Sequence, residues 1–200
     1  MRLAAPLLAA LLAAPVVARA QAESTARRDH FASASESQLD SLYAPLVYLM
    51  HEDERGVYPS LTPPEKRAFL RRFWDRRDPT PRSAKNEAEA EFNTRLAVVN
   101  RKFAEHGAAD VPGWRTDRGR IYLQNGAPDI TLTRRGLPGT MLPFEVWKYT
   151  RTETYRKYCF VDPTWFGNYV LVYSTDPKEP TRSDWRQLLG DDGYEDALQF

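Results

Sequence analysis

The chain has 200 residues, a net charge of +1 with neutral histidines, and one cysteine, Cys159. A near-neutral balance gives no electrostatic footprint for nucleic acid or an anionic membrane. A single cysteine excludes an intrachain disulfide, and its apolar neighbours predict a buried, inert thiol. Five tryptophans, ten tyrosines and nine phenylalanines supply a core for one domain.

Residues 1–22 predict a secretory signal peptide. Arg2 is followed by an uncharged apolar stretch over residues 3–18, and small residues favour cleavage after Ala20 or Ala22. The stretch contains two prolines and is shorter than the ~20 residues that span a bilayer, so we expect no transmembrane segment in the mature chain. The alanine-rich signal is typical of bacteria, and the expected location is therefore the periplasm or the extracellular space.

Residues 23–35 are small, polar and mixed in charge, and they predict a flexible leader. We expect residues 36–200 to form a single domain. Its first half begins with apolar residues at helical spacing from Leu39 to Met50. Pro45 lies inside this pattern and predicts a kink or a restart of the helix.

Two further helices are expected. Thr62 precedes two prolines and has a glutamate three residues later, which is a strong signal for a helix start. That helix should end at Asp78, which precedes a proline. The next helix is expected to start near Ser83 or Asn86 and to stop at Gly107.

The second half of the chain changes to the alternation that is typical of strands. The predicted strands cover residues 120–123, 130–133, 144–149, 155–161 and 169–173. A hairpin turn is expected at 125–129, and a short closing helix at 181–189. Helices followed by strands predict an α+β fold, in which N-terminal helices pack on one face of a C-terminal antiparallel β-sheet.

The segment Gly113–Asp129 carries the densest group of special residues in the chain. One hypothesis makes it a ligand site. Trp114 would then stack on a sugar or another planar group. Arg118 and Arg120 would hold a carboxylate or phosphate, and Asp117 would accept a hydrogen bond from a hydroxyl.

The other hypothesis, which we favour, is a structural clasp between the helices and the sheet. Asp117 would accept N–H bonds of its own turn, and Trp114 would bury against the helical layer. Gly113 and Gly119 would supply backbone freedom. Turn chemistry alone then accounts for each residue type.

The clasp also predicts ion pairs with the helices. Arg118 or Arg120 would pair with Asp78 or Glu87, and Arg77 lies beside Asp78 in the sequence. We therefore count Arg77 and Asp78 among the candidate binding or clasp residues.

Several separated motifs resemble the GWxTD domain family. The motifs are Phe73-Trp74, Arg77-Asp78-Pro79-Thr80-Pro81, Asn86-Glu87, Phe92, Gly113-Trp114-Arg115-Thr116-Asp117-Arg118-Gly119-Arg120-Ile121-Tyr122, Gly126, Pro128-Asp129, Glu145-Val146-Trp147-Lys148-Tyr149, Phe160-Val161-Asp162 and Gly167-Asn168-Tyr169. The resemblance covers roughly residues 40–175 and implies an exported bacterial protein. The family has no accepted catalytic residues, so none can be assigned by the resemblance.

The sequence predicts no catalytic residue, no metal site and no cofactor. His51 and Glu54 could supply two metal ligands, but a stable zinc site needs three or four, and a solvated acidic helix end is favoured. Asp117 could form a carboxylate pair with Glu145 or Asp162, as glycoside hydrolysis requires. No phosphate-binding or dinucleotide-binding loop is present in the sequence.

Two surface features remain open. The arginine-rich second helix, from Arg67 to Arg77, is expected to be solvated and paired within the fold. The loop aromatics Trp165 and Phe166 could serve recognition or could cover a sheet edge.

Taken together, these features predict a non-catalytic binding or interaction module of the cell envelope, whose partner is an envelope protein or polymer. A hydrolase acting on an envelope polymer or peptide is one alternative. A structural subunit of an envelope assembly is the other.

Overall fold

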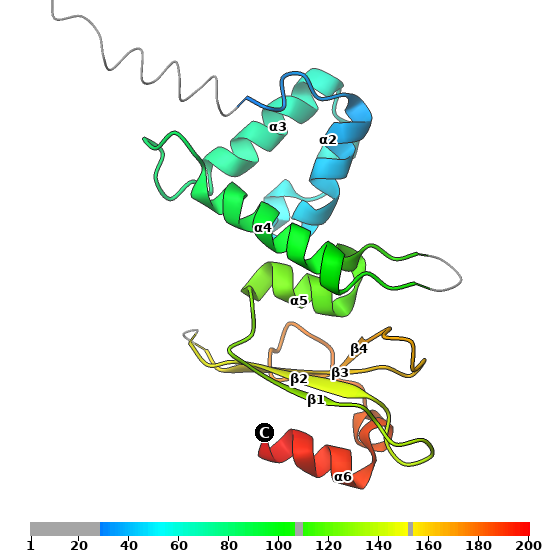
Figure 1. The fold of residues 1–200 in the computed structure, drawn as a ribbon. Helices are drawn as coiled ribbons and strands as arrows, with labels where there is room; N and C mark the ends of the chain where they lie inside the picture. Colours follow the sequence, from blue (N-terminus) through cyan, green and yellow to red (C-terminus); the bar gives the residue numbers. More distant parts are fainter. Residues whose placement is uncertain (1–28, 107–109, 152–153) are drawn as a thin grey trace, which may run out of the picture.

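The computed structural model of the protein describes residues 29–106, 110–151 and 154–200. Helices from the N-terminal part lie on one side of a four-stranded sheet, and a single C-terminal helix lies on the other side (Figure 1). The predicted α+β class is therefore confirmed. The predicted signal peptide lies outside the described residues.

The first helices follow the sequence pattern closely. Helix α2 covers Glu36–Tyr43 and is followed by the 3-10 helix η1, Ala44–Tyr48, with Pro45 in its first turn. The predicted restart at Pro45 is thus confirmed. Two more 3-10 turns follow, η2 at Glu52–Glu54 and η3 at Tyr58–Ser60.

Helix α3 covers Pro63–Asp75, and the backbone N–H of Thr62 donates to the Glu65 carboxylate at 2.8 Å. Helix α4 covers Glu87–Lys102 and is capped by Asn86, whose side chain accepts from the Glu89 N–H at 3.1 Å. Both predicted starts are confirmed. Gly107, the predicted stop of this helix, lies outside the described residues.

Part of the predicted leader is described and contacts the helices. Phe31 is 2% exposed and belongs to the core. The Arg67 guanidinium of α3 donates to the carbonyls of Phe31 and Ala34 at 3.1 and 2.8 Å. Asp29 pairs with Arg71 at 2.8 Å. Residues 29–35 thus pack along α3.

The sheet has the order β1-β2-β3-β4, and all neighbours are antiparallel. The strands are β1 Ile130–Arg134, β2 Phe144–Tyr149, β3 Arg156–Val161 and β4 Val170–Ser174. In the register, Val146 of β2 lies opposite Leu132 of β1 and Cys159 of β3. Four of the five predicted strands are therefore confirmed.

The fifth prediction, a strand at 120–123, is wrong. Asp117–Asn125 forms helix α5, and Thr116 caps it by accepting from the Gly119 N–H at 3.1 Å. Ile121 and Leu123 are both fully buried, although they lie about 200° apart on a helix. This is possible because α5 lies between the helical layer and the sheet (Figure 1). Burial on two sides produced the strand-like alternation.

The predicted hairpin at 125–129 is also wrong. Gly126 has a φ of 79°, ends α5 in a backbone conformation that favours glycine, and leads into β1. The segment therefore joins a helix to a strand rather than two strands.

The core has two parts, one on each face of the sheet. The larger part packs the helices against residues such as Trp147, Tyr158 and Phe160. The smaller part packs α6, Trp185–Gln199, against Val146, Cys159 and the rest of the opposite face. The closing helix therefore starts later than expected, at Trp185. It is interrupted at Gly190, whose backbone is not helical (φ 67°, ψ 172°), and a second helical stretch continues to Gln199.

Candidate functional site

The glycines of the Gly113–Asp129 segment allow close packing of backbones. A Cβ on Gly113 of η4, the 3-10 helix Gly113–Arg115, would lie 1.9 Å from the Val99 carbonyl oxygen of α4. A Cβ on Gly119 would lie 1.8 Å from the Gly113 carbonyl oxygen. Neither glycine has a positive φ. The predicted role in backbone freedom is wrong, because what these positions require is the absence of a side chain.

Trp114 is half-buried between the helices and solvent. Its ring packs edge-on against Tyr48 of η1 with centroids 6.2 Å apart, and the Arg115 guanidinium lies 4.9 Å from its centroid. The Trp114 N–H donates to the Asn100 side chain at 3.2 Å. The indole thus connects η4 to η1 and α4.

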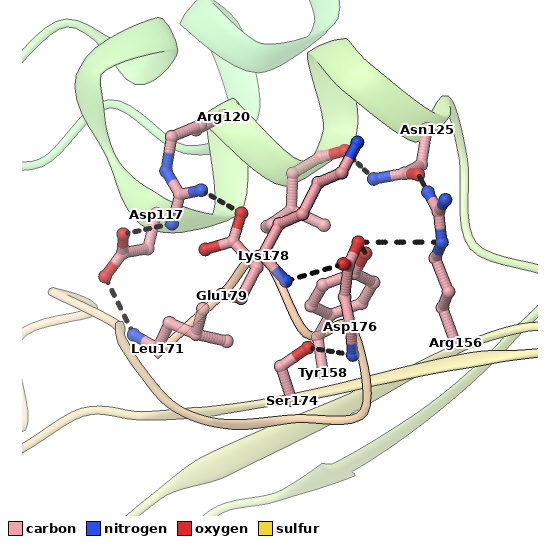
Figure 2. A network of polar contacts seen from close by, with 11 residues as sticks. Asp117, Arg120, Asn125, Arg156, Tyr158, Leu171, Ser174, Asp176, Lys178 and Glu179 are labelled. Carbon is pink, nitrogen blue, oxygen red and sulfur yellow. Dashed lines mark hydrogen bonds and ion pairs between the residues drawn. The ribbon is translucent and has the colours of Figure 1, made fainter. Parts of the chain in front are cut away.

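Asp117 and Arg120 connect α5 to the far end of the chain (Figure 2). One Asp117 oxygen accepts from the Leu171 N–H of β4 at 2.8 Å, and the other accepts from Arg120 at 3.0 Å. Arg120 also pairs with Glu179. Burial lowers the pKa of Arg120, but the hydrogen bonds to Glu179 and Asp117 outweigh it and raise the pKa.

These contacts correct the expectation that Asp117 binds N–H groups of its own turn. That role belongs to Thr116, and Asp117 instead reaches the backbone of β4. Two further contacts lie along the same strand. The Arg182 N–H donates to the Val172 carbonyl at 2.9 Å, and the Ser174 N–H donates to the Thr181 hydroxyl at 3.3 Å.

A second polar group continues this network at the other end of α5 (Figure 2). Arg156 donates to the Asn125 side chain at 2.7 Å and lies 3.6 Å from Asp176. The Tyr158 hydroxyl donates to Asp176 at 3.1 Å. Burial, together with the Asp176 charge, raises the pKa of Tyr158 to about 12. This hydroxyl therefore stays protonated and acts as a donor at neutral pH.

Arg118 is buried in the first turn of α5. It donates to the Gly167 carbonyl at 2.9 Å and lies 3.5 Å from the Glu145 carboxylate. The guanidinium sits 4.0 Å from the ring centroid of Tyr169 and 5.1 Å from that of Phe103. Arg118 therefore fixes the loop between β3 and β4.

Asp162 and Glu105 hold the same loop from inside. The buried Asp162 carboxylate accepts from the N–H groups of Thr164 and Gly167 at 3.0 and 2.6 Å. Glu105 accepts from the Tyr169 N–H at 3.1 Å, and burial raises the pKa of Glu105. Glu105 was not among the residues predicted for the site. Its position just after the end of α4, beside polar residues, is the sequence signal that could have pointed to it.

The predicted partners of the signature arginines are wrong. Arg118 and Arg120 pair with Glu145, Gly167, Glu179 and Asp117, and not with Asp78 or Glu87. Asp78 lies after α3, where its carboxylate accepts from the Thr80 N–H at 3.0 Å.

Arg77 likewise belongs to another contact, which the sequence did not reveal. The Glu54 side chain is 1% exposed and pairs with Arg77 at 2.5 Å. The same guanidinium donates to the Leu49 carbonyl at 2.8 Å. The hydrogen bond from Arg77 lowers the pKa of Glu54 despite burial. The expected solvated acidic helix end at His51–Glu54 is therefore wrong for Glu54.

In residues 29–106, 110–151 and 154–200, no group of three histidine, cysteine or carboxylate side chains is placed to hold a metal ion. Arg67 and Arg71 of α3, and Arg77 just after its end, serve internal contacts. The same described ranges contain no helix with the length and apolar character of a membrane span.

The chain is matched by the GWxTD domain family over residues 17–184 and belongs to that family. This match extends over both the helical layer and the sheet, and the Gly113–Asp129 segment lies in its middle. Comparison with curated proteins and with solved structures gave no match. The family has no known activity.

Proposed function

We propose that this chain is an exported, non-catalytic interaction module of the cell envelope. One observation carries the proposal: the Asp117 and Arg120 side chains of the signature are engaged within the fold. Asp117 has both oxygens occupied, and Arg120 bridges two carboxylates. A catalytic or ligand-binding group needs free hydrogen-bonding capacity toward its substrate. These residues instead join α5 to the sheet.

The surface beside this joint supplies a means of recognition. The loop held by Arg118 and Asp162 presents two exposed aromatic side chains, Trp165 and Phe166. Aromatic residues are enriched among the residues that dominate protein interfaces. A rigid scaffold that presents a loop is a common arrangement for binding.

Two measurements test the proposal. Cell fractionation should find the mature chain outside the cytoplasm, shortened at its N-terminus. Asp117→Asn should lower the melting temperature, because the Leu171 N–H would then face a weaker acceptor. Turnover of a cell-wall polymer or peptide by the pure protein, abolished in Asp117→Asn at unchanged melting temperature, would refute a non-catalytic role.

One observation favours the hydrolase alternative. Burial raises the pKa of Glu105, and a carboxyl group with a raised pKa suits a general acid. Asp117 and Asp162 both contribute to its electrostatic surroundings. Glu105→Gln tests this role, since it would abolish turnover of cell-wall polymer by a hydrolase.

A further inference from the structure

Strand β1 forms one edge of the sheet (Figure 1). Its five residues pair with β2 in an unbroken register, and they include neither glycine nor proline. Apart from that ladder, one hydrogen bond involves the β1 backbone within the described ranges: the Arg134 guanidinium donates to the Thr133 carbonyl at 3.4 Å. The outer side of β1 therefore presents N–H and C=O groups that another extended strand can pair with.

The rest of the chain covers the other edge of the sheet but not this one. At β4, groups of Asp117, Thr181 and Arg182 bind the strand backbone, as described above. Beside β1, no contact of this kind exists within residues 29–106, 110–151 and 154–200. Sheets commonly protect an edge with a bulge, a proline or a covering loop, and β1 has none of these devices.

The side chains of β1 suit a second copy of the same strand. Two residues that lie directly opposite each other must share a face of the sheet. Among antiparallel registers that meet this condition, the one centred on Leu132 pairs all five residues. Leu132 then meets Leu132 of the second copy, and Thr131 meets Thr133 of the second copy. Threonine pairs and aliphatic pairs at such positions stabilise a sheet.

This register also covers exposed apolar surface. Leu132 is half-buried and packs at the margin of the core between the sheet and α6. Ile130 lies on the same face of β1 and is 48% exposed. In the antiparallel pair, Ile130 lies opposite Arg134 of the second copy and diagonal to its Leu132. Arg134 is neutralised by Asp196 at 2.6 Å, so its aliphatic stem covers Ile130 without bringing in an unpaired charge.

The charges of the strand favour the antiparallel direction. Arg134 and Arg135 lie together at its C-terminal end. A parallel pairing in register would place each arginine beside its own copy. The antiparallel pairing instead sets the two arginine pairs at opposite ends of the interface, a strand length of roughly 17 Å apart.

We propose that this chain forms a two-fold symmetric dimer, in which β1 pairs antiparallel with β1 of a second copy and Leu132 lies at the axis. The two sheets then become one continuous sheet, with both helical layers on one face and both α6 helices on the other. The inference goes beyond the proposed function and does not rest on it, because the loop that presents Trp165 and Phe166 joins β3 to β4, away from β1.

The test is a charge pattern that reads the register. Thr131 and Thr133 are both exposed, so charged residues at these positions leave the core of each copy intact. In the double variant Thr131→Glu with Thr133→Glu, each glutamate lies opposite a glutamate of the second copy. In the matched double variant Thr131→Lys with Thr133→Glu, each lysine lies opposite a glutamate.

The measurement is sedimentation equilibrium of the full chain, expressed in a bacterium and purified in the form that the cell accumulates. The wild type should be a weak dimer with a Kd in the micromolar range, because the pairing is short. The variant with two glutamates should have a Kd roughly tenfold higher, and added salt should reduce this difference. The variant with lysine and glutamate should dimerise at least as tightly as the wild type. Both variants should keep the melting temperature of the wild-type monomer.

Three outcomes would overturn the inference. The first is a wild-type chain that stays monomeric at about 1 mM. The second is a dimer that both double variants weaken equally, which indicates a parallel or shifted pairing. The third is a dimer that neither variant weakens, which places the contact away from β1. Each of these outcomes leaves the proposed interaction with an envelope component intact.

Discussion

Replacing Gly119 with alanine should destabilise the protein, although alanine is the better helix former. In an ordinary helix interior this change would stabilise by up to about 1 kcal/mol. Here the added Cβ would lie 1.8 Å from the Gly113 carbonyl oxygen and 2.7 Å from its carbon. Real Cβ atoms do not approach other atoms within 3.0 Å, so the neighbour must move by more than 1 Å.

Neither side of this contact can yield easily. The obstructing atoms are backbone, and Gly113 itself has no room beside the Val99 carbonyl of α4. Overpacking of this kind costs about 1–3 kcal/mol and occasionally more. The rigid surroundings place Gly119 near the upper value. After subtracting the gain in helix propensity, we expect a loss of about 2 kcal/mol in the free energy of unfolding.

The assay is urea unfolding followed by tryptophan fluorescence, with a thermal melt as a second measurement. For a chain of this size the expected loss lowers the melting temperature by roughly 4–8 °C. Gly193→Ala in α6 is the matched control. Its Cβ would meet the Met141 sulfur at 2.8 Å and a Phe144 ring carbon at 3.0 Å, and the flexible thioether can move away. We expect a change below about 1 kcal/mol there.

A Gly119→Ala protein as stable as the wild type, or more stable, would refute the reasoning. It would mean that α4, η4 and α5 are less closely packed than the structure has them. A loss in both variants of equal size would show a general intolerance of alanine at helical glycines rather than a steric effect of the α5 contact.

Three further predictions concern single side chains. Asp117→Ala should lower stability by ~1–3 kcal/mol in the same assay, because the buried Leu171 N–H and Arg120 lose an acceptor; Asp110→Ala, at an exposed aspartate, should change it little. Arg77 depresses the pKa of Glu54, so the stability this carboxylate adds is present above its unfolded pKa, near 4.3, and is lost as the pH falls through the lower folded pKa. The stability difference between wild type and Glu54→Gln should therefore shrink in acid, and a constant difference from neutral pH to pH ~3 would contradict it. Burial raises the pKa of Cys159 to about 12, so its thiol should react with a thiol reagent only on unfolding; rapid reaction in the native state would contradict its burial.

The elements with clear local signals could be predicted from the sequence. β2 and β3 alternate or run apolar between clear turn signals, and α3 has a strong start at Thr62. Helix α5 was misjudged because its Ile121 and Leu123 face two different layers. Thr116 is a residue type that often caps a helix, and it does cap α5. The alternation of apolar residues nevertheless favoured a strand.

The partners of the site residues could not be predicted for a different reason. Arg118 binds a carbonyl 49 residues away, Asp117 an N–H 54 residues away and Arg120 a carboxylate 59 residues away. Such pairs depend on how the layers are placed in space, which local patterns do not encode. The pair of Glu54 and Arg77 also joins residues that are distant in sequence, 23 positions apart. In addition, an acidic run such as the one that contains Glu54 is usually solvated, so burial was not expected.

The contact between Asp117 and β4 has a consequence for the behaviour of the sheet in solution. An outermost strand offers unpaired backbone groups that can recruit a strand from another molecule and start aggregation. Along β4, the Leu171 N–H donates to Asp117 and the Ser174 N–H donates to the Thr181 hydroxyl. The Val172 carbonyl accepts from the Arg182 N–H. The side chain that fastens α5 to the sheet thereby also blocks sheet extension at β4, and its loss would open a template for intermolecular pairing.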